Sequence, residues 1–60
     1  MVFYIEPQRH GLDRRVFRRT PSGALEWAHY SDWSRDAKRA RYYGSFLTNV
    51  PDGAEEFYDD

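Results

Sequence analysis

The stretch RRVFRRTPSGALEWAHY, residues 14–30, decides the fold that we predict for this 60-residue chain. Its centre, residues 20–24 (TPSGA), has the composition of a turn, because proline presets φ at the first turn position and Gly23 tolerates a left-handed conformation. A three-residue loop of this kind pairs Thr20 with Ala24 and thereby sets the register of the residues on either side. We therefore expect a β-hairpin, with one strand before the turn and one after it.

The register of this hairpin predicts which side chains share a face of the sheet. Counted outward from the turn, the pairs are Arg19 with Leu25, Arg18 with Glu26, Phe17 with Trp27, Val16 with Ala28, Arg15 with His29 and Arg14 with Tyr30. Because side chains alternate between faces, Phe17, Leu25 and Trp27 fall on one face, which we expect to be the core. The other face receives the opposite-charge pair of Arg18 with Glu26. A slip by one residue would scatter both groups, so their agreement supports the hairpin.

After residue 31 the sequence changes from the two-residue period of a strand to the period of a helix. Small and apolar residues recur every three or four positions, at Trp33, Ala37, Ala40, Gly44 and Leu47. Ser31 or Asp32 would cap the first turn of this helix. The helix would run on to residues 49–51, or it would stop at Tyr43 with Gly44 as a left-handed cap.

Residues 2–7 (VFYIEP) favour one further strand, because β-branched and aromatic residues alternate and a proline ends the run. The predicted fold is therefore α+β, with a small three-stranded antiparallel sheet in β-β-β-α order and one helix packed on one face. Residues 1–50 would form this compact domain, and residues 51–60 an acidic tail that is either a loop or a short fourth strand. A rival assignment replaces the second hairpin strand by a helix that starts at Ser22 and continues through Trp27.

The net charge of −1 conceals an uneven distribution of charge along the chain. Residues 8–41 contain all nine basic residues and only four acidic ones, a net charge of +5, whereas residues 52–60 contain five acidic residues and no basic one. Either the tail neutralises the basic part of the same molecule, or one end contacts a charged partner and the tail competes for that site.

Composition argues against several classes of protein. The chain has no cysteine, so neither a disulfide nor a thiolate zinc site stabilises it. The first residues lack the basic region and the long apolar run typical of a signal peptide, and no run approaches the ~20 apolar residues that a membrane span needs. We therefore expect a cytoplasmic protein that does not contact a membrane. No nucleophile motif surrounds a serine, and the four glycines are too dispersed for a phosphate-binding loop. We therefore expect no enzyme activity, no cofactor and no metal site.

The predicted architecture leaves two surfaces as candidate contact sites. The first is the sheet face without a helix, which by alternation carries the partner-binding candidates Tyr4, Arg14, Val16, Arg18 and Tyr30. The second is a helical stripe of Arg35, Arg39, Tyr42 and Phe46. Tyrosine and arginine are enriched at interaction hot spots, although arginine stems also commonly cover apolar surface in the absence of any partner.

Our first hypothesis is a small protein-binding module or inhibitor, comparable by architecture alone to the small regulators encoded by phages and mobile elements. It would act by steric occlusion, with Tyr4 and Tyr30 buried against a partner protein while arginines pair with the partner's carboxylates. Alternatively, the free edge of the first or second strand would add to a partner's sheet or to a second copy of the chain, forming a homodimer.

Our second hypothesis is single-stranded nucleic-acid binding, because arginines interleaved with aromatic residues on a sheet form stacking platforms. In a further version, the acidic tail imitates a nucleic acid. The sequence pI of about 6.1 argues against a dedicated nucleic-acid-binding domain, for which a value above about 9 is typical.

Overall fold

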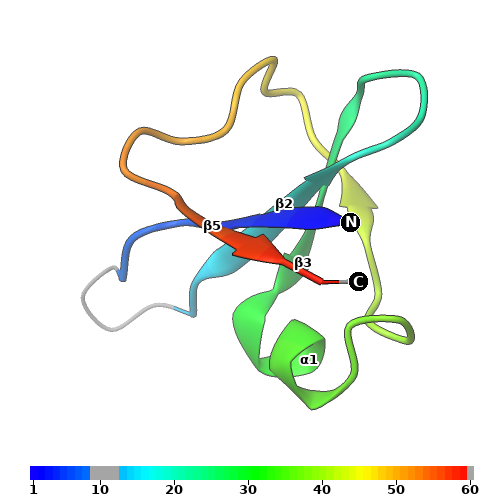
Figure 1. The fold of residues 1–60 in the computed structure, drawn as a ribbon, viewed down its shortest axis with the longest axis vertical. Helices are drawn as coiled ribbons and strands as arrows, with labels where there is room; N and C mark the ends of the chain where they lie inside the picture. The colour runs from blue at the N-terminus through cyan, green and yellow to red at the C-terminus, as the bar shows by residue number, and fades with distance from the viewer. Residues whose placement is uncertain (9–12, 60) are drawn as a thin grey trace.

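The computed structural model describes residues 1–8 and 13–59, which form a five-stranded antiparallel sheet and one short helix (Figure 1). The elements in chain order are β1 (Val2–Ile5), β2 (Arg15–Arg19), β3 (Leu25–His29), α1 (Tyr30–Arg35), β4 (Tyr43–Gly44) and β5 (Glu55–Tyr58). The strand order across the sheet is β4-β3-β2-β1-β5. The predicted fold of three strands with a long packed helix is therefore wrong, because the sheet is larger, the helix is shorter and the chain is mostly β.

The hairpin of β2 and β3 has the predicted register, with each of the five pairs from Arg15–His29 to Arg19–Leu25 in place. The Thr20 backbone N–H donates to the Ala24 carbonyl at 2.8 Å, which closes the turn. Gly23 has a φ of +91°, in the left-handed region that the turn requires. These local interactions confirm that the turn sets the register of the hairpin.

The helix α1 ends before Asp36 because two aspartate side chains bind the backbone that would have to continue it. The Asp36 carboxylate accepts hydrogen bonds from the backbone N–H of Lys38 at 3.1 Å and of Arg39 at 3.4 Å. The Asp32 carboxylate accepts one from the backbone N–H of Arg41 at 2.8 Å. Such side-chain bonds compete with the helical ladder and favour turns. The predicted long helix is wrong for this reason.

The start of α1 also differs from the prediction. The residue at the N-cap position is His29, and it makes no side-chain capping bond, whereas the predicted caps Ser31 and Asp32 lie within the first turn. The rival helix over residues 22–27 is wrong, because β3 is extended there. Within the described residues, no helix has the length and apolar character needed to cross a membrane.

On the β2–β3 hairpin, the helix covers the opposite face from the one predicted. The pairing of β1 with β2 places Tyr4 opposite Phe17 and Ile5 opposite Val16. The buried cluster under α1 accordingly consists of Phe3, Ile5, Val16, Ala28, Trp33 and Ala40. We call this the helix-side face. The expectation that Phe17 packs under the helix is wrong, because Phe17 shares a face with Tyr4.

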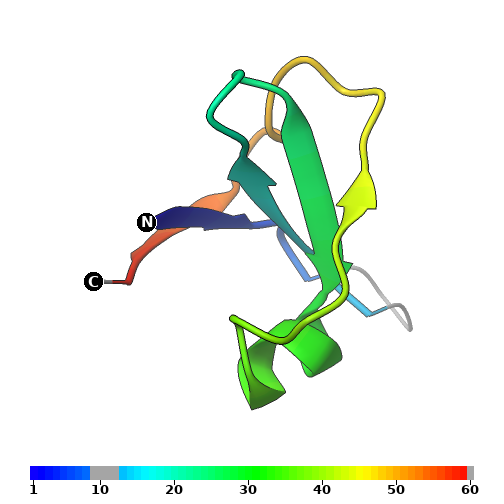
Figure 2. The same cartoon turned by 90° about the vertical axis from the view of Figure 1, so that its right-hand side faces the viewer.

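The other face, which we call the loop-side face, is also covered at its centre. Phe17 is fully buried, and Leu25 is 3% exposed. Residues 45–54 connect the two edge strands, and the Thr48 carbonyl on this loop accepts a hydrogen bond from the Arg19 guanidinium at 3.2 Å. Figure 2 shows this loop arching over the end of the sheet opposite α1. The uncovered sheet face that we predicted is therefore absent at the centre of the described sheet.

The acidic tail forms the edge strand β5, which pairs with β1 so that Phe57 lies opposite Phe3. The ladder continues to the ends of the described chain, where Met1 and Asp59 exchange two backbone hydrogen bonds of 2.6 and 2.8 Å. The predicted free edge at the first or second strand is wrong, because β1 and β2 each have a neighbour on both sides. The edges of the sheet are β4 and β5.

Candidate functional site

The outer edge of β5 carries backbone groups that no other strand of the described sheet covers. In an antiparallel ladder, pairs that exchange hydrogen bonds alternate with pairs that do not. Because Met1 and Asp59 exchange bonds, the same holds for Phe3 and Phe57, two residues along. The N–H and C=O groups of Glu56 and Tyr58 therefore point away from β1. All four residues of β5 are exposed, so this edge is open to an added strand.

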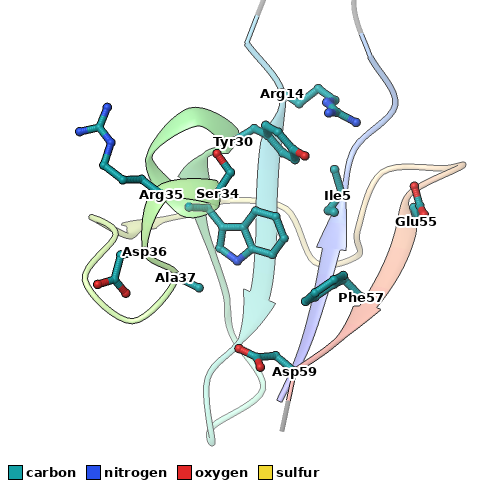
Figure 3. Close-up of a pocket in the computed structure, with 11 residues that line it drawn as sticks. Ile5, Arg14, Tyr30, Ser34, Arg35, Asp36, Ala37, Glu55, Phe57 and Asp59 are labelled. Carbon is teal, nitrogen blue, oxygen red and sulfur yellow. The ribbon is translucent and has the colours of Figure 1, made fainter.

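A groove adjoins β5 on the helix-side face (Figure 3). Its larger part has a volume of about 530 Å³ and lies between α1 with the turn after it on one side and β1 with β5 on the other. A smaller part of about 280 Å³ shares Ala37 and Asp59 with the larger one and extends toward Met1 and Lys38. The two cavities therefore adjoin near the edge strand, and the term groove covers both.

The floor of the groove is a cluster of aromatic rings around Trp33. This ring is 8% exposed and makes edge contacts with Phe3 at 5.5 Å and with Phe57 at 5.4 Å between ring centroids. Tyr30 lies at 5.6 Å from it. The Trp33 Nε1 atom is buried without a hydrogen-bond partner in the described part of the chain. Phe57 remains 46% exposed, so the floor presents apolar surface to the groove.

Charged groups surround this apolar floor. At one end the Arg14 guanidinium lies over the Tyr30 ring, 4.0 Å from its centroid. Glu55 in β5 and Asp59 directly after the strand line the groove on either side of Phe57. Neither carboxylate makes an ion pair with another residue among residues 1–8 and 13–59. The β5 wall of the groove is therefore acidic, with an apolar centre.

The predicted partner-binding residues do not form one surface. Arg14 and Tyr30 line the larger part of the groove, and Arg18 lines the smaller part. Val16 has no exposed surface and belongs to the core beneath α1. Tyr4 lies on the loop-side face, because it pairs with Phe17. Three of the five residues thus meet at the groove, and the other two do not.

The second predicted surface is also dispersed, because no long helix forms. Arg35 ends α1, and Arg39 lies in the turn after it. Tyr42 packs against the core, donates its hydroxyl to the Ala37 carbonyl at 2.7 Å and stacks under the Arg18 guanidinium at 3.5 Å. Phe46 is fully exposed on the loop of residues 45–54. The predicted spacing on one helical stripe therefore does not exist.

The candidate site residues predicted from the sequence did not include Glu55, Phe57 and Asp59, which form the β5 wall of the groove, or Trp33 at its floor. The tail did contain a signal, since Phe57 and Tyr58 are aromatic residues with high β propensity within an acidic segment. What the sequence did not show was the partner strand, because β1 and β5 lie at opposite ends of the chain.

A second aromatic surface lies on the loop-side face at the β4 edge. The Trp27 and Tyr43 rings are 4.9 Å apart, and His29 makes an edge contact with Trp27 at 5.0 Å. The Arg41 guanidinium lies 5.6 Å from the Tyr43 ring, and the Arg15 guanidinium 6.0 Å from the Trp27 ring. This aromatic and basic surface is the closest match in the structure to the predicted stacking platform.

Two tyrosines have shifted acidities. Burial raises the pKa of the Tyr42 phenol, and the nearby Arg18 guanidinium opposes that shift. On β5, a hydrogen bond to the Glu56 carboxylate raises the pKa of the exposed Tyr58 phenol. Both phenols are therefore protonated hydrogen-bond donors near neutral pH.

A comparison with protein-family models, with curated proteins and with solved structures finds no match. Within the residues that the structure describes, no three His, Cys, Asp or Glu side chains lie close enough to hold a metal ion.

Proposed function

We propose that the chain is a small, non-enzymatic protein-binding module that binds a segment of a partner protein along β5 and its groove. The observation that carries this proposal is an edge strand that is exposed at all four residues and borders a groove with an aromatic floor. Sheet edges of soluble proteins are usually shortened, covered or charged, because they pair readily with other chains. An edge beside an apolar groove suits recognition by strand addition.

The groove combines features that distinguish protein contact sites from ordinary surface. Its floor offers the exposed part of Phe57, and its end carries the stacked pair of Arg14 and Tyr30. Aromatic and arginine side chains are the residue types that most often dominate binding energy at protein interfaces. Occupation of the groove by one partner segment would block that segment sterically, as an inhibitor does.

The proposal includes a cytoplasmic location and a regulatory role. The chain has no cysteine, whereas secreted domains of this size usually depend on disulfides. Small regulators of the kind encoded by phages and mobile elements offer an architectural analogy.

The experiment that tests this proposal is affinity capture with two matched variants. Phe57→Glu places a charge in the floor of the groove, whereas Phe46→Glu makes the same change at an exposed phenylalanine on the distant loop. We expect wild type and Phe46→Glu to recover the same partner and Phe57→Glu to lose it, with circular dichroism showing that all three fold. Equal recovery by the three baits would contradict the proposal.

A specific observation also favours nucleic-acid binding as a second candidate function. The Trp27 and Tyr43 rings, with Arg41 beside them, offer a surface on which bases stack. Titration with a single-stranded oligonucleotide at low and high salt separates the two candidates, because phosphate contacts make binding steeply salt-dependent. Tight binding of that kind, lost in Tyr43→Ala and kept in Phe57→Glu, would replace the protein-binding proposal.

A further inference from the structure

The alternation of side chains along β5 carries information about the sequence of the partner segment. We infer that the partner is an extended basic segment in which an apolar residue, opposite Phe57, is flanked two positions away on each side by Lys or Arg. This inference rests on the proposed function and specifies the ligand of the same site.

The register of an added strand follows from the backbone of β5. Glu56 and Tyr58 point their N–H and C=O groups outward, so an antiparallel strand exchanges hydrogen bonds at these two positions. The residue opposite Phe57 then occupies the intervening pair without hydrogen bonds, in which cross-strand side chains lie closest together. An added strand thus places one side chain directly against the Phe57 ring.

The groove determines the chemistry of that central side chain. Phe57 and Trp33 stand edge to face at 5.4 Å, and Phe57, which is 46% exposed, lines the groove (Figure 3). A volume of about 530 Å³ accommodates a large side chain. Because covering the exposed ring removes apolar surface from water, an aromatic or aliphatic residue is favoured at this position.

The flanking charges determine the chemistry two positions away. On the groove side, Glu55 and Asp59 lie on either side of Phe57, and neither forms an ion pair within the described chain. Opposite charges directly across a ladder stabilise the pairing of strands, and like charges destabilise it. Lys or Arg is therefore the complement at both flanking positions of the partner.

The same charges argue against two other occupants. A second copy of the chain that paired through β5 would bring two acidic strands together, since residues 52–60 contain five acidic residues and no basic one. A nucleic acid would place phosphates beside these carboxylates. A basic extended peptide is the occupant that the charge of this edge favours.

The probe for the inference is a capped peptide of sequence TRTFTRT, titrated into the full chain at up to millimolar concentration and followed by the backbone amide signals of Glu56 and Tyr58. We expect these signals to shift and the peptide TETFTET to bind roughly tenfold more weakly or worse. In the double variant Glu55→Arg/Asp59→Arg the preference for the basic peptide should reverse. Asp52→Arg, which changes an exposed acidic residue outside β5, should keep the wild-type preference.

N-methylated peptides test whether binding occurs by strand addition. Methylation of the two threonines beside the phenylalanine removes the N–H groups that would donate to Glu56 and Tyr58, and it should abolish binding. Methylation at the phenylalanine itself removes an N–H that points away from β5, so this control peptide should still bind.

Three outcomes would overturn the inference. Equal binding of the basic and acidic peptides would show that charge does not select the ligand, and self-association through β5 would identify a second copy as the occupant. Absence of any shift at Glu56 and Tyr58 would show that this edge does not take a basic strand. If affinity capture still depends on Phe57 in any of these cases, the proposed function stands and only the ligand assignment fails. If it does not, both fail.

Discussion

The Glu6 carboxylate and the Arg15 guanidinium form a two-point ion pair on the loop-side face, with both nitrogen–oxygen distances at 3.1 Å. The backbone N–H of Arg15 donates a third hydrogen bond to the same carboxylate at 2.8 Å. The Glu6 side chain is only 4% exposed, while that of Arg15 is 31% exposed. This pair joins the end of β1 to the start of β2 and holds a charged group inside the fold.

Removal of the buried partner of this pair should destabilise the protein strongly. Glu6→Ala leaves the Arg15 charge partly buried without its carboxylate, for which we expect a loss of about 3 kcal/mol in the free energy of unfolding, because breaking one partner of a buried pair costs about that much. The control Glu26→Ala breaks the more exposed pair with Arg18 and should cost about 1 kcal/mol or less. Urea unfolding followed by circular dichroism measures the loss of stability in both variants. Equal losses would contradict the prediction that the more buried pair contributes more.

The two tryptophans should differ in their contribution to stability. Trp33→Ala removes the ring that joins Phe3, Tyr30 and Phe57, so we expect a loss of about 3–5 kcal/mol and failure to fold stably. Trp27→Ala should cost less, because Trp27 is only partly buried on the loop-side face. Thermal unfolding of both variants tests whether Trp33→Ala is the more destabilising of the two. If Phe17 and Trp27 formed the main core, Trp27→Ala would be the more destabilising.

Two glycine substitutions should have opposite effects. Gly23 has a φ of +91°, so Gly23→Ala should destabilise the hairpin by more than about 1 kcal/mol. Gly44 lies in β4 with a φ that side chains tolerate and no atom near an added Cβ, so Gly44→Ala should stabilise the protein by about 0.4–1 kcal/mol. Denaturant unfolding measures the sign of the change in the free energy of unfolding for each variant. Destabilisation by Gly44→Ala would contradict the β4 conformation.

Deletion of residues 52–60 should unfold or destabilise the protein. The deletion removes β5 and thereby uncovers the edge of β1 and the Phe3 ring, which is 3% exposed in the full chain. We expect a loss of sheet signal in circular dichroism and a lower unfolding temperature. An unchanged spectrum and melting temperature would show that the tail does not form the edge strand in solution.

Stability should decrease at high pH through Tyr42. Burial raises the pKa of this phenol above its ordinary value of 10.0, so between that value and the raised one the unfolded state holds fewer protons than the folded state. The free energy of unfolding therefore falls as the pH rises through this window and is independent of Tyr42 below it. Tyr42→Phe should be less stable near neutral pH by about 1 kcal/mol, because the bond to Ala37 is lost. It should also lose less stability than wild type as the pH rises above 10.0. If the free energy of unfolding fell equally with pH in wild type and in Tyr42→Phe, Tyr42 would not be the source of the pH dependence.

The parts of the fold that could be predicted from the sequence depend on neighbours in the chain. The turn at residues 20–24 and the alternation around it were enough to predict every pair between β2 and β3. They also predicted the contact of Arg18 with Glu26, which lie eight residues apart. For the candidate site, the chemistry of Arg14 and Tyr30 was recognisable, but the surface that they share with β5 was not.

The wrong predictions, of the face that the helix covers and of the length of the helix, came from sequence patterns that are compatible with two different structures. Val16 and Phe17 are adjacent and both fully buried, so alternation alone could not identify the face that the helix covers. The repeat after Trp33 fitted a helix until Asp32 and Asp36 bound the backbone of the following turn. The first choice depended on the pairing of β1 with β2 and the second on the turn that these two aspartate side chains form with the residues after the helix.

The sequence by itself determined the β2–β3 hairpin, its register and its turn. A tight turn fixes which residues pair across the two strands, and the alternation of side chains along each strand then assigns every residue to a face. Only the tertiary structure decided which face α1 covers and where the acidic tail lies. The β1–β2 register crosses a gap of nine residues, and the residues that pair between β1 and β5 lie 50 to 56 positions apart in the sequence. Such non-local pairing depends on burial summed over the whole sheet, which no short stretch of the chain specifies.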